Sequence, residues 1–414
     1  MTSDMVRSSK KIQERQMSDL GSLVDMNYQL HPSFQFKSEA FRVDESMVKQ
    51  FDIEYGNPKS MESESEILER LSRLTNLAKS VFKQMSGQSS EKGISLFLQE
   101  LELRFLNYLN EEFTVRKKVT SNVSRIQDRE EFNLLQKNLH FYGTLSEYSC
   151  KKILSIAEVE LQEFRKRADQ GFLERKDLSV NSGGTVRKIC NEIEKNFHKM
   201  GIFKIISAYF QVPYDHVGLS LELSDFRSLW WRNALKETSA PRTMYAHLDE
   251  TFFAPKAIVY LSEVEDRSGP TKLYPKAYRL IQNPAFKDIV GRVIGSIVHN
   301  PEVRKLYDIN NGQLFSSQVF REHFMKLPEL IRFNSHFGWD VQPNSELEED
   351  LASMEEVFLG KPGDFIIFDG AQLLHRGGLI ESGQRVVLQV VFQVSNPKVR
   401  KRVLMNMAQG KLLK

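Results

Sequence analysis

The sequence is poor in cysteine and has no long apolar run. Its 414 residues include two cysteines, Cys150 and Cys190, each in a segment whose apolar residues recur at helical spacing. Two cysteines do not make a disulfide framework, so we expect free buried thiols and a cytoplasmic location. The apolar runs fall far short of the ~20 residues that span a bilayer, and the polar N-terminus lacks the apolar core of a secretory signal. The sequence therefore predicts no membrane span.

An excess of charge of one sign is also absent. The chain has 57 Lys and Arg against 54 Asp and Glu, which gives a formal net charge of +3 at pH 7. Because positive and negative charges are nearly equal in number, the whole surface is not expected to capture nucleic acid. We expect a small-molecule substrate instead. The basic segment 398–414, with its run from Lys398 to Arg402, is typical of a solvated tail; anionic substrates or nucleic acid are the alternatives.

Helical patterns dominate the first half of the chain. Residues 1–20 are polar and are expected to be flexible, and residues 21–204 are predicted to form a mainly helical region. Further helical stretches are predicted at about 94–113, about 126–167 with interruptions, and 186–197. Their apolar faces are expected to form core or, alternatively, a homo-oligomer surface. The clearest stripe predicts a helix that stops at Gly87 and consists of Ile67, Leu71, Leu74, Ala78, Val81 and Met85.

Strand patterns begin near residue 205. Alternation at 216–223 and β-branched or aromatic runs at 257–261, 364–368 and 385–394 predict short strands. Because no helices are interleaved between them, antiparallel pairing is favoured over a parallel sheet. We predict an α+β protein with a barrel-like or sandwich domain over 205–397, which carries a helical insertion at 276–360.

Two motifs in the second half carry residues suited to a metal. His247 and Asp249 are two apart, so on a strand their side chains point to the same face and can reach one ion. His375 closes a later strand, and Arg385 follows ten residues further on. Two imidazoles and one carboxylate suit iron(II) and leave positions open for a 2-oxo acid and O2. An arginine is the best partner for the far carboxylate of such an acid, because its planar fork pairs bidentately and stays charged.

These motifs resemble the phytanoyl-CoA dioxygenase family. The residues that carry the resemblance are 246–249, 257–264 and 269–275, followed by the Gly363 to Arg385 segment, and together they cover roughly 205–395. The resemblance implies a double-stranded β-helix (jelly-roll) core. It implies that the catalytic residues His247, Asp249 and His375 bind iron(II), and that Arg385 anchors the co-substrate 2-oxoglutarate.

The resemblance has one departure and adds further candidates. The family often has Pro-Gly-Ser-His where Pro275 is here followed by Lys-Ala-Tyr, so contacts at that loop are not carried over. Tyr260 and Thr271 lie where a barrel wall can hydrogen-bond the co-substrate, with core and turn roles as the alternatives. Gln389 shares the face of Arg385 by alternation, which favours a place in the pocket lining.

The predicted function is an iron(II)- and 2-oxoglutarate-dependent dioxygenase that hydroxylates a small or medium-sized metabolite and forms succinate. Related halogenases have a small residue at the position of Asp249, so an acid there favours hydroxylation. Two alternatives remain open, an oxygenase acting on a macromolecule and a non-catalytic metal-binding or vestigial jelly-roll module. Structural zinc prefers four protein ligands, often cysteines, and the two cysteines lie far from the motifs.

Overall fold

The chain divides into two compact units. The first comprises residues 1–119, 234–250 and 279–353, and the second comprises 120–233, 251–278 and 354–414. A computed structural model describes residues 41–55, 63–116, 126, 128–171, 177–210, 212–227, 249, 254–277, 285–294, 326–331, 351–378 and 380–395. The predicted flexible N-terminus at 1–20, the basic tail at 398–414 and most of the insertion at 276–360 lie outside these residues.

The first unit is helical. It contains α3 (Glu45–Tyr55), α4 (Glu64–Gly87), α5 (Lys92–Arg116), α11 (Ala285–Ile294) and the short 3-10 helix η7 (Glu329–Ile331). Helix α4 begins at a capping box, in which the Ser63 side chain accepts from the Glu66 amide and the Glu66 carboxylate accepts from the Ser63 amide. The predicted stripe and the stop at Gly87 are confirmed.

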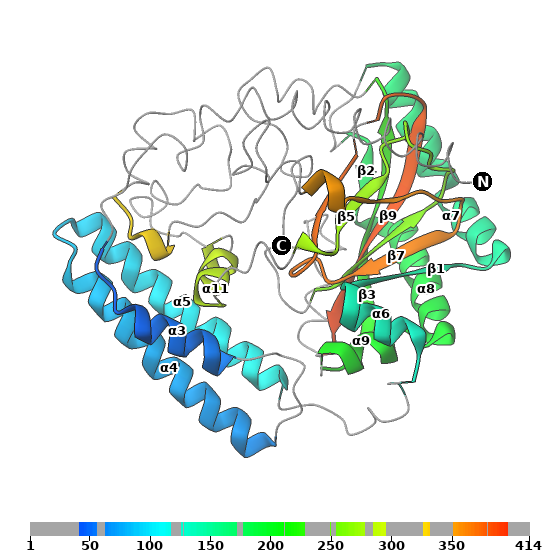
Figure 1. Cartoon of the computed structure of the whole chain (residues 1–414). Coiled ribbons are helices and arrows are strands. Elements are labelled where there is room, and N and C mark those ends of the chain that lie inside the picture. Colours follow the sequence, from blue (N-terminus) through cyan, green and yellow to red (C-terminus); the bar gives the residue numbers. More distant parts are fainter. Residues whose placement is uncertain are drawn as a thin grey trace. The chain divides into compact units, whose positions relative to one another are not determined.

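Helix α11 packs on the N-terminal helices, beside α3 and α5 (Figure 1). Phe286 of α11 has its ring centroid 4.7 Å from Phe105 and 5.2 Å from Phe51. Asp52 of α3 accepts a hydrogen bond of 2.9 Å from the Phe286 amide, in the first turn of α11. A helix N-terminus favours a carboxylate, so this bond ties α11 to α3 as well as capping it.

The described residues of the second unit form four helices and two antiparallel sheets. Its helices are α6 (Glu130–Asn138), α7 (Glu147–Asp169), α8 (Gly183–Met200) and α9 (Ile202–Phe210). The larger sheet has the order β1-β7-β4-β9-β3-β2 and the smaller has the order β6-β5-β8. The strands are β1 (His140–Thr144), β2 (Ser179–Val180), β3 (Tyr214–Asp225), β4 (Lys256–Tyr260), β5 (Thr271–Tyr274), β6 (Glu356–Phe358), β7 (Asp364–Phe368), β8 (Leu374–Arg376) and β9 (Gln384–Val394).

All pairings between these strands are antiparallel, as predicted. One face of the larger sheet packs on helices, where Phe197 of α8 lies 5.4 Å, ring to ring, from both Phe365 and Phe392. The opposite face meets the smaller sheet, where the rings of Tyr260 and Phe358 stack at 4.4 Å. The larger sheet is therefore covered on both faces within this unit.

Three details differ from the sequence-based expectations. The stretch 126–167, predicted as helical, contains β1 between α6 and α7, because β1 pairs with β7 along its whole length. The region after 205, predicted as strands, begins within α9. The predicted boundary at 205 also differs from the observed division. Residues 120–204 belong with the strands, because their helices cover the apolar face of the larger sheet.

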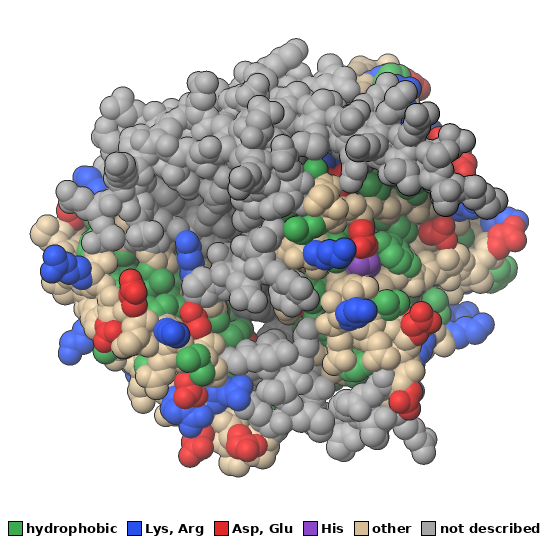
Figure 2. Space-filling view, viewed as in Figure 1, with side chains coloured by type: hydrophobic (Ala, Val, Ile, Leu, Met, Phe, Trp, Pro, Cys, Tyr) green, Lys and Arg blue, Asp and Glu red, His purple; other side chains and the backbone are tan. Residues whose placement is uncertain are grey.

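Charged side chains of both signs lie on the described surface (Figure 2), and the two cysteines are buried. Figure 2 shows Lys and Arg side chains interspersed with Asp and Glu on the described surface of one face. Both cysteines are buried and free, as predicted. Among the described helices, none has the length and apolar character required to cross a membrane.

Candidate metal and co-substrate site

His375 lies in the middle of β8 with its ring oriented by its own strand. Its side chain is buried, and Nδ1 lies 2.8 Å from the carbonyl oxygen of Leu373. A ring nitrogen facing a carbonyl donates a hydrogen bond, so Nε2 carries the lone pair, which is the tautomer that a metal-binding histidine uses. The ring packs at 4.8 Å against Phe368 of β7, so His375 faces the space between the two sheets.

Arg385 lies at the start of β9 on the face turned toward the smaller sheet. The side chain is buried, and Nη1 donates to the carbonyl oxygen of Gly269 in the turn before β5. Gly269 has φ +71°, and a Cβ there would lie 2.6 Å from Ile380 Cγ1 and 2.7 Å from the Gly378 oxygen. Only glycine fits this close approach, so the turn that receives Arg385 depends on Gly269.

Tyr260 of β4 connects β5 and β6 and lies near the Arg385 charge. Its hydroxyl donates to the Phe358 carbonyl oxygen at 2.8 Å and accepts from the Thr271 amide at 3.1 Å. Burial raises the pKa of this phenol, against the opposing effect of the nearby Arg385 charge. The structure thus brings together Arg385, Tyr260 and Thr271, three of the predicted co-substrate residues.

Gln389 lies on the same face of β9 and binds a buried acid that sequence reasoning missed. Its Nε2 donates to Glu222 of β3 at 3.2 Å, and the Ser220 hydroxyl donates to the same carboxylate at 2.9 Å. Glu222 is 9% exposed. The alternation of β3 indicates that Ser220 and Glu222 share a face, but only the register with β9 shows that this face is buried.

A second polar cluster lies on the other face of the smaller sheet. Glu355 accepts from Lys272 Nζ at 3.0 Å, from Arg376 Nη2 at 2.8 Å and from the Tyr274 hydroxyl at 2.6 Å. Burial acts to raise the pKa of Glu355, but the two cations outweigh it and lower the pKa to about 2. This carboxylate is therefore ionised at neutral pH. Nothing in the sequence patterns indicated this cluster.

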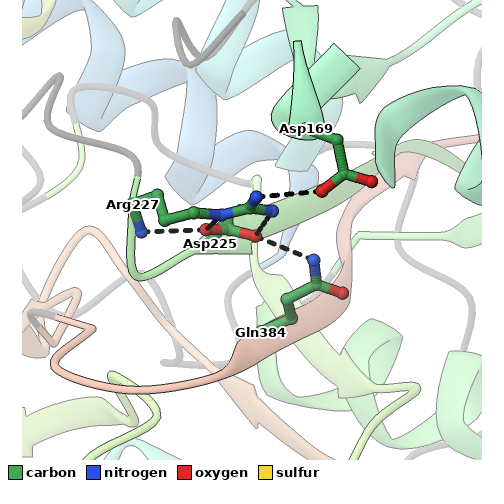
Figure 3. Close-up of polar contacts among 4 residues, drawn as sticks. All are labelled: Asp169, Asp225, Arg227 and Gln384. Atoms are coloured by element: carbon green, nitrogen blue, oxygen red, sulfur yellow. Dashed lines mark hydrogen bonds and ion pairs between the residues drawn. The ribbon is translucent and has the colours of Figure 1, made fainter. Parts of the chain in front are cut away.

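A third network fixes the end of the larger sheet where β9 begins (Figure 3). Arg227 pairs with Asp225 through Nε and Nη2, both at 2.8 Å, and with Asp169 at the end of α7 at 2.9 Å. Gln384 donates to the same Asp225 carboxylate at 2.8 Å. Burial acts to raise the pKa of Asp225, but the bonds from Arg227 and Gln384 hold it below its ordinary value. Gln384, the residue before Arg385, is thereby bonded to Asp225 of β3 and linked through Arg227 to Asp169 of α7.

The other two predicted metal ligands are not tested. His247 lies outside the described residues, and Asp249 is a half-buried residue of the first unit. Among the described residues there is no group of three or more side chains suited to hold a metal. The meeting of His247, Asp249 and His375 at one ion therefore stays a prediction.

Comparisons with known proteins give distant structural likenesses. No family model matches the chain, and no curated protein matches it. The epimerase SnoN, in complex with Fe3+, alpha ketoglutarate and nogalamycin RO, is 12% identical with a TM-score of 0.33, over 66% of this chain and 84% of that one. AviO1 from Streptomyces viridochromogenes is 12% identical with a TM-score of 0.33, over 67% and 97%. HygX from Streptomyces hygroscopicus, with nickel and 2-oxoglutarate bound, is 11% identical with a TM-score of 0.31, over 64% and 87%. Values this low establish neither the fold nor the function of this chain, whose own residues have to carry both.

Proposed function

We propose that the chain is an iron(II)- and 2-oxoglutarate-dependent dioxygenase that uses O2 to hydroxylate a small or medium-sized metabolite. The observation that carries the proposal is the grouping of His375, Arg385, Tyr260 and Thr271 in the space between the two sheets. A buried guanidinium is a donor suited to a carboxylate. A buried imidazole with its lone pair on Nε2 is suited to a metal.

The strand pairings support a jelly-roll core. In an eight-stranded jelly roll the first strand pairs with the eighth, the third with the sixth and the fourth with the fifth. If β3 is the first strand and β9 the eighth, these pairs are β3 with β9, β4 with β7, and β5 with β6, and all three are present. The pair still to be accounted for is the second strand with the seventh, which is β8. The three residues of β8 are all buried, although β5 is its one partner among the described strands.

We propose that His247 and Asp249 complete an iron(II) site with His375. Iron(II) held by the three side chains would supply the O2 chemistry. The chain's own residues would then have separate tasks. Arg385 would bind the far carboxylate of the co-substrate, and Tyr260 would hold Thr271 at the start of β5 beside it.

Anaerobic visible spectroscopy tests the proposal. Iron(II) and 2-oxoglutarate added together are expected to produce a weak charge-transfer band that neither produces alone. The band is expected to vanish in His375→Ala and to persist in His198→Ala, a matched change of a histidine on α8 that contacts Phe203 and lies off the inter-sheet face. No band in the wild-type protein with iron bound would contradict the 2-oxoglutarate assignment, and no bound iron would contradict the metal site.

A further inference from the structure

Behind His375, two buried cations face each other across a strand pair. Lys272 of β5 lies directly opposite Arg376 of β8, and both side chains are more than nine-tenths buried. Like charges directly opposite in an antiparallel pair destabilise it, and burial strengthens the repulsion because little water screens it. The next pair along the same two strands is Leu273 with His375. The repulsion therefore acts one residue away from the predicted metal ligand.

One carboxylate holds the two cations together. Glu355 binds Lys272 through one oxygen and Arg376 through the other, and Tyr274 of β5 donates to the oxygen that Arg376 also contacts. The side chain of Glu355 is 5% exposed, so solvent does not replace these contacts. Glu355 directly precedes β6, so the cluster joins β5 and β8 to the start of β6.

We propose that Glu355 is a positioning residue for His375, acting through the β5–β8 pair. This inference rests on the proposed function, because it takes His375 as a metal ligand. Neighbouring residues of a strand point to opposite faces, so Arg376 is held on one face of β8 while the imidazole projects from the other. His375 is oriented by a carbonyl of its own strand, so any shift of β8 moves Nε2 with it.

Cobalt(II) affinity of the metal-free full-length protein, measured by calorimetric titration, tests this role, with thermal unfolding recorded separately. Glu355→Gln leaves the two cations opposed and is expected to weaken cobalt binding about 10- to 100-fold, as loss of a group that orients a ligand does. The double variant Lys272→Met with Glu355→Gln removes one cation along with the anion. It is expected to bind within about threefold of wild type, since loss of the repulsion restores the strand pair.

The matched control is Glu192→Gln, which removes another buried acid of the same unit. Glu192 lies on α8 and pairs with Lys152 at 2.7 Å, on the helical side of the larger sheet. The control is expected to keep wild-type cobalt affinity even where it lowers the unfolding temperature. An equal loss in Glu192→Gln and Glu355→Gln, or wild-type affinity in a folded Glu355→Gln protein, would overturn the positioning role alone.

A second variant covers the case in which Glu355→Gln does not fold. Glu355→Asp keeps the charge but is one methylene shorter, so it cannot hold both cations at the observed distances. It is expected to weaken cobalt binding in the same direction, and unchanged affinity would overturn the inference. If the wild-type protein itself bound no cobalt, that result would contradict the proposed metal site and, with it, the positioning role of Glu355.

Discussion

At the scale of single residues, the inter-sheet face of the second unit carries polar side chains beside a buried apolar cluster that includes Tyr260, Ile366 and Phe368. Glu222, Gln389 and Arg385 project from neighbouring strands into this space, and each is held by hydrogen bonds that the structure shows. Burying such groups is costly unless their partners are supplied. Their presence on this face, while the helix-covered face is apolar, supports the proposed binding site between the sheets.

Arg385 allows a direct test at one position. Arg385→Lys keeps the charge but removes the planar fork that pairs bidentately with a carboxylate. Loss of one charged hydrogen bond, about 2 kcal/mol, corresponds to a roughly thirtyfold weaker affinity for 2-oxoglutarate at saturating iron(II). The measurement is the co-substrate concentration dependence of the charge-transfer band. Gln393→Ala, on the same face of β9 near its other end, is the control, and an unchanged Arg385→Lys protein would reassign the anchor.

At the scale of elements, the β5–β8 pair makes stability depend on pH in a defined direction. The pKa of Glu355 lies near 2 in the folded chain, below its ordinary value of 4.5. A carboxyl whose pKa is lowered by folding contributes its stability above the ordinary value, and that contribution is lost as pH falls from about 4.5 toward 2. The difference amounts to roughly 3 kcal/mol.

Urea unfolding between pH 6 and pH 3 measures this contribution. The wild-type free energy of unfolding is expected to fall more steeply over this range than that of the Lys272→Met with Glu355→Gln double variant, which lacks the carboxyl. Parallel curves for the two proteins would show that Glu355 is not the titrating group.

The sequence could predict the long strands and helices, and the five-residue strands β4 and β7 from their β-branched and aromatic runs, but not the shortest strands. β3 and β9 have 12 and 11 residues, and α4 has 24, so their periodicity is clear. β5, β6 and β8 have three or four residues each, too few for a pattern, and β1 is a strand because of its register with β7.

The candidate site divides in the same way. Motif spacing and alternation along one strand are local properties, and they single out His375, Arg385, Tyr260, Thr271 and Gln389, whose roles stay predictions. The ion cluster of Lys272 and Arg376 with Glu355 could not be predicted, since it depends on which residue of β8 lies opposite which residue of β5. Register between distant segments is set by tertiary packing, which local patterns do not encode.

At the scale of the whole molecule, the helices of the first unit carry apolar side chains that their own core does not use. Ile53 of α3 is 70% exposed and Leu103 of α5 is 61% exposed, whereas Phe51, Phe105 and Phe286 fill the core between these helices. Single exposed apolar residues are normal on protein surfaces. Exposed apolar residues on the N-terminal helices, such as Ile53 and Leu103, are also what the predicted homo-oligomer surface requires.

Light scattering coupled to size-exclusion chromatography decides between these readings. If the N-terminal helices associate, the wild-type protein is expected to elute at twice the 48.0 kDa chain mass at micromolar concentration. Ile53→Glu and Leu103→Glu would each shift it toward the monomer, because a charge buried in an apolar interface has no partner. Val159→Glu, at a 68% exposed position of α7 in the second unit, should leave the mass unchanged. A wild-type monomer, or dissociation by Val159→Glu alone, would remove the N-terminal helices as the oligomer surface and leave Ile53 and Leu103 as ordinary surface residues.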